Sequence, residues 1–285
     1  MRLSRIGRGA ALLAILAVAL RAGADTTPPV MLKTTEFGHG PTVVLLHTVG
    51  SARMVWMPTA KKLLATHHVV MVDLPGHGES PLPDPFSLAA CAEALDQVLA
   101  KQKPDSTVLV AHRFAGLIAL TEVQVHPDRV RGLMVIDAAT RSPTPIPEQQ
   151  QQYFLTMLDE HYDEFLKGMM MGQARDSVQG NEMYSQAQSV PAASIKAYFK
   201  AALNADASGA LKTMRPTLMF LASAKVWPDG TDWPTIAKRL GYDDAPTLLT
   251  RRIPDCGPLI MKEQPDSLAA AIRDFTAQAL AAKKK

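Results

Sequence analysis

Eight histidines, two cysteines and 27 acidic residues are the side chains with which this chain could bind a metal ion. Their spacing argues against a metal site, because no H-E-x-x-H or C-x-x-C motif occurs and no cluster of histidines with acidic residues appears at ligand spacing. The G-H-G segment at residues 76–78 lacks the third glycine and the Lys-Ser/Thr ending of a phosphate-binding loop. The sequence therefore predicts no metal and no cofactor.

Serines and histidines could support nucleophilic catalysis, since a hydroxyl becomes a nucleophile when a nearby imidazole takes its proton. Ser51 and Ser223 are candidate nucleophiles, and His47, His77 and His112 are candidate bases. No spacing singles out one pair among them. A catalytic site built from these residues stays an open alternative.

Short apolar runs alternate with helical segments along most of the chain. Strands are expected at residues 43–46, 69–72, 108–110, 133–136, 218–221 and 248–249, and helices at residues 87–102, 114–126 and 266–282. Continuous apolar strands between helices are typical of a parallel sheet covered on both faces. We expect an α/β fold with a doubly wound, mostly parallel sheet.

Residues 141–206 interrupt this alternation. Three prolines at positions 143, 145 and 147 open a segment with helical patterns and no strand signal. We interpret it as a small helical cap inserted into a core formed by residues 25–140 and 207–285. Its methionines and aromatic residues could line an adaptable apolar pocket, or simply pack the cap onto the core.

The first 24 residues have the features of a secretory signal peptide. Three arginines precede an apolar run at residues 10–20, and A-G-A at residues 22–24 resembles a cleavage site. The run is shorter than the roughly 20 residues needed to cross a bilayer. We expect a secreted or periplasmic protein, cleaved near Ala24, with no membrane span in the mature chain. In that compartment Cys91 and Cys256 could form a disulfide, although either can serve as a small buried apolar residue.

The charge balance excludes one class of partner. The whole chain has 30 basic and 27 acidic residues, but four of the arginines lie in the signal segment, so the mature chain is almost neutral. Nucleic acid is therefore not an expected partner. A small apolar or anionic molecule is a possible ligand, and the sequence names no protein partner.

Four stretches, in order, resemble the α/β-hydrolase superfamily of the esterase and lipase type, with a lid inserted after the sixth strand. They read V-L-L-H at residues 44–47, V-D-L-P-G-H-G-E-S at 72–80, H-P-D-R-V-R-G at 126–132 leading to I-D-A-A at 136–139, and I-P-D-C-G at 253–257 followed by E-Q-P at 263–265. The resemblance covers nearly all of the mature chain and implies the fold of that superfamily.

The resemblance also implies a catalytic triad, whose positions are occupied by other residues. The nucleophile elbow G-x-S-x-G reads A-H-R-F-A at residues 111–115, which places Arg113 at the serine position. A guanidinium that stays protonated cannot attack a carbonyl carbon, and the two alanines are expected to resist the elbow geometry. Lys225 stands at the position of the acid and Pro258 at that of the histidine.

The oxyanion-hole positions of the family correspond to Thr48, Val49 and Phe114, with Thr48 in place of a glycine. Loss of a complete triad lowers turnover about a millionfold. The sequence therefore predicts a secreted, catalytically degenerate hydrolase that keeps a pocket for a small apolar or anionic ligand. Two alternatives stay open: an active carboxylic-ester hydrolase with a relocated or non-standard site, and a non-catalytic protein-interaction scaffold.

Arg113 and Lys225 are expected to point toward the pocket. Two buried cations need partners, so Asp137, Asp229 or Asp255 could neutralise them in a salt-bridge cluster. Alternatively, Arg113 at the start of a helix binds a carboxylate or phosphate. Other candidate ligand-binding residues are His47 and His112.

Overall fold

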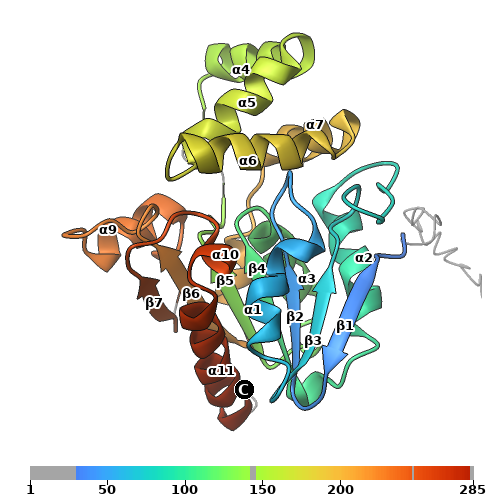
Figure 1. The fold of residues 1–285 in the computed structure, drawn as a ribbon, viewed down its shortest axis with the longest axis vertical. Coiled ribbons are helices and arrows are strands. Elements are labelled where there is room, and N and C mark those ends of the chain that lie inside the picture. Colours follow the sequence, from blue (N-terminus) through green and yellow to red (C-terminus); the bar gives the residue numbers. More distant parts are fainter. Residues whose placement is uncertain (1–29, 142–145, 246, 283–285) are drawn as a thin grey trace, which may run out of the picture.

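The computed structural model describes residues 30–141, 146–245 and 247–282. Its centre is a seven-stranded sheet with the order β1-β3-β2-β4-β5-β6-β7 (Figure 1). The strands are β1 (Thr34–Gly38), β2 (Thr42–Leu46), β3 (His68–Val72), β4 (Thr107–His112), β5 (Gly132–Ile136), β6 (Thr217–Ser223) and β7 (Leu249–Ile253). β1 is antiparallel to β3, and all other neighbouring pairs are parallel. The predicted α/β class with a mostly parallel sheet is confirmed.

The central strands are apolar on both faces because helices cover both sides of the sheet. Every residue of β2, β4 and β5 is buried. In Figure 1, α1 and α11 lie in front of these strands, and α2 and α3 lie behind them. Sequence analysis missed β1, because this partly exposed edge strand, T-T-E-F-G, has no apolar run.

The helical elements of the core connect these strands. They are η1 (Arg53–Trp56), α1 (Met57–Lys61), α2 (Leu88–Leu99), η2 (Pro104–Ser106), α3 (Ala115–Val125), α8 (Gly209–Lys212), α9 (Trp233–Leu240), α10 (Ile260–Glu263) and α11 (Pro265–Ala281). The Ser87 hydroxyl caps α2 by accepting the N–H of Ala90, and the Asp232 carboxylate caps α9 by accepting the N–H of Thr235.

Four helices lie between β5 and β6, at the end of the sheet where the parallel strands finish (Figure 1). They are α4 (Glu148–Glu160), α5 (Tyr162–Gln173), α6 (Ser177–Gln188) and α7 (Ala192–Ala202). A β-bridge between Arg141 and Asp206 joins the two chain segments that lead into and out of this group. We call these four helices the cap. The cap covers the loops that follow β2 and β4, which places it over the carboxyl edge of the sheet.

The predicted signal peptide, residues 1–24, lies outside the described residues. Within the described part of the chain, none of the helices combines the length and the hydrophobicity that a bilayer-spanning segment requires.

Candidate active site

The turn between β4 and α3 has the backbone conformation of a nucleophile elbow. Arg113 adopts φ 54°, a left-handed conformation that is unusual for a residue with a side chain. Its N–H donates to the carbonyl of Ile136 at 2.7 Å, and its own carbonyl accepts the N–H of Gly116 at 2.8 Å. The resistance expected from the two alanines does not keep the chain from this turn, and Ala111 and Ala115 are buried in the core with no exposed surface. Such strain costs on the order of 1–3 kcal/mol and is concentrated at functional sites.

Asp137 follows β5 and is the second strained residue at this edge, with φ 51°. Its side chain is buried, and two groups of Ser223 hold it: the N–H donates to Oδ1 at 2.8 Å and the hydroxyl donates to Oδ2 at 2.7 Å. Burial raises the pKa of Asp137, while the nearby Arg113 cation and the two Ser223 donors oppose this effect. A carboxylate with a raised pKa is a stronger base than an exposed one.

Arg113 extends from the elbow toward the cap. One of its terminal nitrogens, Nη1, donates a hydrogen bond to the Gln173 side chain at the end of α5. No carboxylate of the described residues forms an ion pair with this guanidinium. Burial lowers the pKa of Arg113, and the Asp137 charge opposes the change. A guanidinium carries five N–H donors, so most of them remain available to a bound oxygen atom.

Arg113 and Asp137 line the same cavity, of about 640 Å³, between the cap and the carboxyl edge of the sheet. Its other lining residues are mainly apolar. The full set is Thr48, Val49, Arg113, Phe114, Leu117, Asp137, Ala139, Arg141, Ile146, Phe154, Met169, Met170, Gln173, Phe199, Ala202 and Leu203. An apolar cavity with a few convergent polar groups has the usual make-up of a small-molecule site.

The three residues predicted for the oxyanion hole, Thr48, Val49 and Phe114, all line this cavity. Among the described residues, no oxygen atom accepts a hydrogen bond from their backbone N–H groups. These amides are therefore available to a developing negative charge on a substrate oxygen. Thr48 stands where the family pattern has a glycine, and its loop still borders the cavity.

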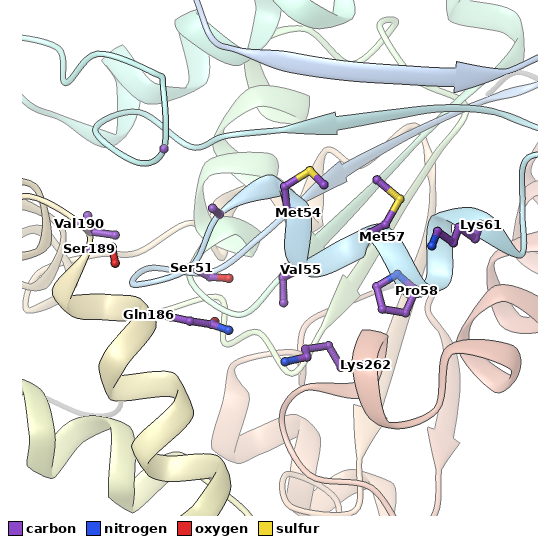
Figure 2. A pocket seen from close by; sticks show the side chains of 12 residues that line it. Ser51, Met54, Val55, Met57, Pro58, Lys61, Gln186, Ser189, Val190 and Lys262 are labelled. Carbon is purple, nitrogen blue, oxygen red and sulfur yellow. The ribbon is translucent and has the colours of Figure 1, made fainter.

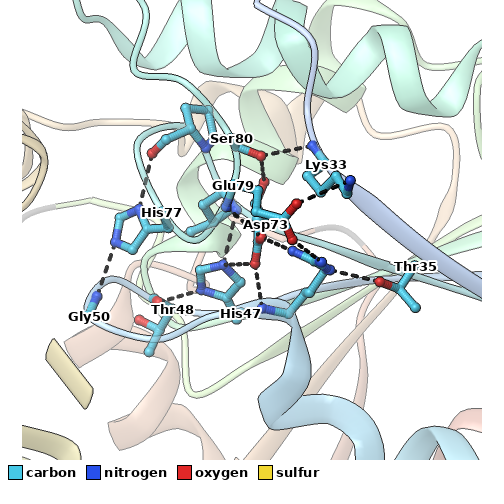
Figure 3. Close-up of polar contacts among 12 residues, drawn as sticks. Lys33, Thr35, His47, Thr48, Gly50, Asp73, His77, Glu79 and Ser80 are labelled. Carbon is cyan, nitrogen blue, oxygen red and sulfur yellow. Dashed lines mark hydrogen bonds and ion pairs between the residues drawn. The ribbon is translucent and has the colours of Figure 1, made fainter. Parts of the chain in front are cut away.

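His47 and His77 hold this loop and do not line the cavity (Figure 3). Nδ1 of His47 bonds the carbonyl of Thr48 at 2.7 Å, and its Nε2 accepts the N–H of Leu74 at 3.0 Å. His77 bonds the carbonyl of Pro75 through Nδ1 and accepts the N–H of Gly50 at its Nε2. Burial lowers the pKa of His47 to about 3 and that of His77 to about 4.

A buried carboxylate anchors the next turn of the chain (Figure 3). Asp73 accepts the N–H groups of Arg53 at 2.7 Å and Glu79 at 3.1 Å, and it pairs with the Arg53 guanidinium. Gly78 has φ 53°, and a Cβ at this position would be 2.1 Å from the Asp73 Oδ2 atom. Only glycine fits at this position. Packing against Asp73 therefore accounts for Gly78 in the G-H-G segment, and no phosphate ligand is needed to explain it.

Other predicted site residues do not meet at the cavity. Lys225 is exposed in the turn after β6 and has no ion-pair partner among the described residues, so the expectation that it faces the pocket is wrong. Pro258 is buried before α10 and does not line the cavity. Asp229 pairs with Arg252 at 2.7 Å. The proposed salt-bridge cluster around Arg113 and Lys225 is therefore absent from the described part of the chain.

His112 does not line the cavity either. It is buried at the end of β4, its Nε2 atom has no hydrogen-bond partner among the described residues, and its ring stacks edge-on with Trp56. Burial and the adjacent Arg113 charge hold its pKa well below the usual range. It is therefore a neutral core residue rather than a ligand-binding one.

The alternative of a relocated serine–histidine pair does not match the contacts. The Ser223 hydroxyl is bonded to Asp137, and Ser51 lines a different cavity. No hydrogen bond joins either serine to His47, His77 or His112 among the described contacts.

The two cysteines, Cys91 and Cys256, are buried and unpaired, and burial raises the pKa of both thiols. One group of potential metal ligands occurs among the described residues, Asp96, Glu122 and His126. The Arg129 guanidinium already contacts both Asp96 oxygens, so this group forms an ion-pair network between α2 and α3.

Sequence reasoning named Asp137 only as a partner for cations, and it did not name Gln173 or Arg141 as site residues. The position of Asp137 directly after an apolar strand was a usable signal, since strand ends at the carboxyl edge meet the ligand in open α/β sheets. Gln173 gives no such signal, because only the packing of the cap brings it to Arg113.

Part of this chain is similar to curated proteins that are named as esterases. A pimeloyl-[acyl-carrier protein] methyl ester esterase from Pseudoalteromonas atlantica is 39% identical over 107 residues, which are 37% of this chain and 40% of that protein. One from Aeromonas salmonicida is 36% identical over 103 residues, 35% of this chain and 39% of that protein. The chain thus matches about two fifths of the length of these curated relatives.

Solved structures share the fold over most of the chain. A thermophilic esterase from Thermogutta terrifontis has a TM-score of 0.73 at 22% identity and covers 89% of this chain and 96% of its own. A hydrolase from Oleispira antarctica has a TM-score of 0.73 at 17% identity, with 86% and 94% covered.

The prediction of a catalytically degenerate hydrolase is contradicted by these relatives, which bear the names of ester-cleaving enzymes. It equated the absence of a serine triad with the absence of hydrolysis, whereas the strained elbow and the cavity are both in place. The model of the "Alpha/beta hydrolase family" matches residues 43–271. The chain therefore belongs to the alpha/beta hydrolase family.

Proposed function

We propose that this protein hydrolyses carboxylic esters with an apolar acyl group, and that a water molecule rather than a serine is the nucleophile. The observation that carries the proposal is the convergence of Asp137 and Arg113 on one apolar cavity with three unengaged backbone amides. The relatives' printed names support an ester of an acyl chain as the substrate class.

Each group has a role that fits its surroundings. Asp137 takes a proton from water, and the water oxygen forms a bond to the carbonyl carbon of the ester. The negative charge that develops on the carbonyl oxygen is stabilised by Arg113 and by the N–H groups of Val49 and Phe114. The bond to the alcohol oxygen then breaks, and the protonated Asp137 returns its proton to that oxygen.

Ser223 and Gln173 keep the two charged groups in place. The two hydrogen bonds from Ser223 fix the orientation of the Asp137 carboxylate. The Gln173 side chain holds one guanidinium nitrogen of Arg113 and so links the catalytic edge to the cap. The apolar walls exclude bulk water, which strengthens the electrostatic contacts inside the cavity.

The test is hydrolysis of methyl and p-nitrophenyl esters of straight-chain acids by the purified chain. We expect saturable turnover, and a loss of about 10²–10⁴-fold in kcat for Asp137→Asn, the range typical of a general base. Asp128→Asn is the matched control, because this exposed carboxylate pairs with Arg215 at the surface, outside the cavity. A serine-directed organophosphorus probe should leave the activity unchanged.

Two results would overturn the proposal. The first is absence of turnover with every ester in the series. The second is inactivation by the organophosphorus probe together with full activity of Asp137→Asn, which would require a serine nucleophile.

A further inference from the structure

A second cavity of about 640 Å³ borders the loop that follows β2 (Figure 2). Its walls come from the loop after β2, from η1, α1 and α10 of the core, and from the end of α6 in the cap. The two cavities share no lining residue. They are neighbours along the chain, because Thr48 and Val49 line the first cavity and Ser51 and Ala52 line the second. The segment of residues 48–52 therefore borders both.

The contact between this loop and the cap is made by small or flexible groups. Gly50 lies between Val49, which lines the first cavity, and Ser51, which lines the second. A Cβ at Gly50 would lie 3.1 Å from Cβ of Ala187 and 3.4 Å from Cε of Met170. Ala187 belongs to α6, and Met170, on α5, also lines the first cavity. A thioether methyl can move by rotation about single bonds, so Met170 is a flexible side chain at the contact between this loop and the cap.

The charge of the second cavity differs from that of the first. Its ionisable lining residues are Lys61 and Lys262, and none of its lining residues is acidic. Lys262 contacts Glu182 on α6, whereas Lys61 has no ion-pair partner among the described residues. The Ser51 hydroxyl adds a hydrogen-bond donor, whereas the Gln186 amide already donates to Glu182 at 3.4 Å. In Figure 2 Lys262 reaches from α10 toward Gln186.

The floor of this cavity is apolar, formed mainly by methionine, valine and proline side chains of η1 and α1. Positive charge and donors around an apolar floor suit an amphiphilic anion, because its apolar part can be buried while its charged end meets a cation.

We propose that the second cavity binds the alcohol half of the ester, and that this alcohol carries an anionic group. This inference rests on the proposed hydrolase function, because it assigns the acyl half to the first cavity and the leaving alcohol to the second. The Met170 side chain separates the two halves and moves aside when an ester spans both cavities.

The experiment compares two esters of the same straight-chain acid, the ethyl ester and the 2-sulfoethyl ester. The double variant Lys61→Glu, Lys262→Glu should raise KM at least tenfold for the sulfoethyl ester and change KM for the ethyl ester less than twofold. Lys238→Glu, on α9 and outside both cavities, is the matched charge-reversal control and should leave both esters unaffected. Met170→Ala should raise kcat/KM for the sulfoethyl ester.

Calorimetry with hexyl phosphate tests the site without turnover. Binding should weaken at least tenfold in the double lysine variant and persist in Arg113→Ser. If Arg113→Ser abolishes binding and the lysine variant retains it, or if both esters respond equally to charge reversal, the second cavity is not the alcohol site. Turnover of neither ester, with lysine-dependent hexyl phosphate binding, would refute the hydrolase proposal and the alcohol role but leave an anion site.

Discussion

The buried carboxyl of Glu122 should make the stability of this protein depend on pH in a way that one substitution removes. Glu122 lies on α3 with no exposed side-chain surface, and its carboxyl contacts Nδ1 of His126 at 3.1 Å. Burial raises its pKa from 4.5 to about 7, against the opposing effect of His126. The folded protein therefore holds a proton that the unfolded chain releases at lower pH.

The sign and size of the effect follow from this difference. A raised carboxyl pKa stabilises the folded state below pH 4.5, and this stability is lost as the pH rises through 7. A pKa difference of this size corresponds to about 3 kcal/mol, most of which falls between pH 5 and pH 8. The side-chain amide of the variant Glu122→Gln cannot ionise, so that variant avoids the loss.

The assay is urea unfolding followed by circular dichroism at pH 5 and pH 8. The free energy of unfolding of Glu122→Gln, minus that of the wild type, should be larger at pH 8 than at pH 5 by about 2–3 kcal/mol. Glu93→Gln, on the exposed side of α2, is the control and should show a constant difference. The reasoning fails if Glu122→Gln also shows the same difference at both pH values.

Three further predictions concern the site, the turn that supports it and the N-terminus. The kcat/KM for a neutral ester should rise with pH through the raised pKa of Asp137, since only the carboxylate accepts a proton; a profile flat from pH 4 to 8 would contradict this. Asp73→Asn should lower the free energy of unfolding by about 1–3 kcal/mol, because the asparagine amide cannot accept all the hydrogen bonds that the buried carboxylate accepts from the Arg53 and Glu79 N–H groups and from the Arg53 guanidinium; chemical denaturation against Asp128→Asn measures the difference. Mass spectrometry of protein exported from a bacterial host should find a chain beginning at Asp25, and an intact Met1 would refute the signal-peptide prediction.

The fold could be predicted because its signal is local. Apolar segments such as residues 43–46 and 133–136 are long enough to identify buried strands, and the residues between them predict helices. The edge strand β1 was not predicted, because an exposed, antiparallel strand does not need an apolar run. Its pairing with β3 depends on contacts between distant parts of the chain.

The site was predictable only in part. Motif position indicated Arg113, Thr48, Val49 and Phe114, and all four line the first cavity because the turns after neighbouring parallel strands lie at the same edge of the sheet. The strained conformation of Arg113 was not foreseen, since it depends on a hydrogen bond to Ile136 on the neighbouring strand. Lys225 was misplaced because the turn after β6 directs it to solvent, a choice that its residue type does not encode.

The buried imidazoles of His47 and His77 bond the loop that follows β2, and they limit the stability of this protein at acid pH. Each already accepts a backbone N–H at Nε2, so a proton arriving there must expel the amide of Leu74 or Gly50. With pKa values of about 3 and about 4, both rings stay neutral in the folded state while those of an unfolded chain become charged below about pH 6.5. At pH 5 each ring therefore costs about 2 kcal/mol of folding free energy. Acidification should loosen first the part of the chain that holds the substrate's carbonyl oxygen, so catalysis would stop before the sheet itself comes apart.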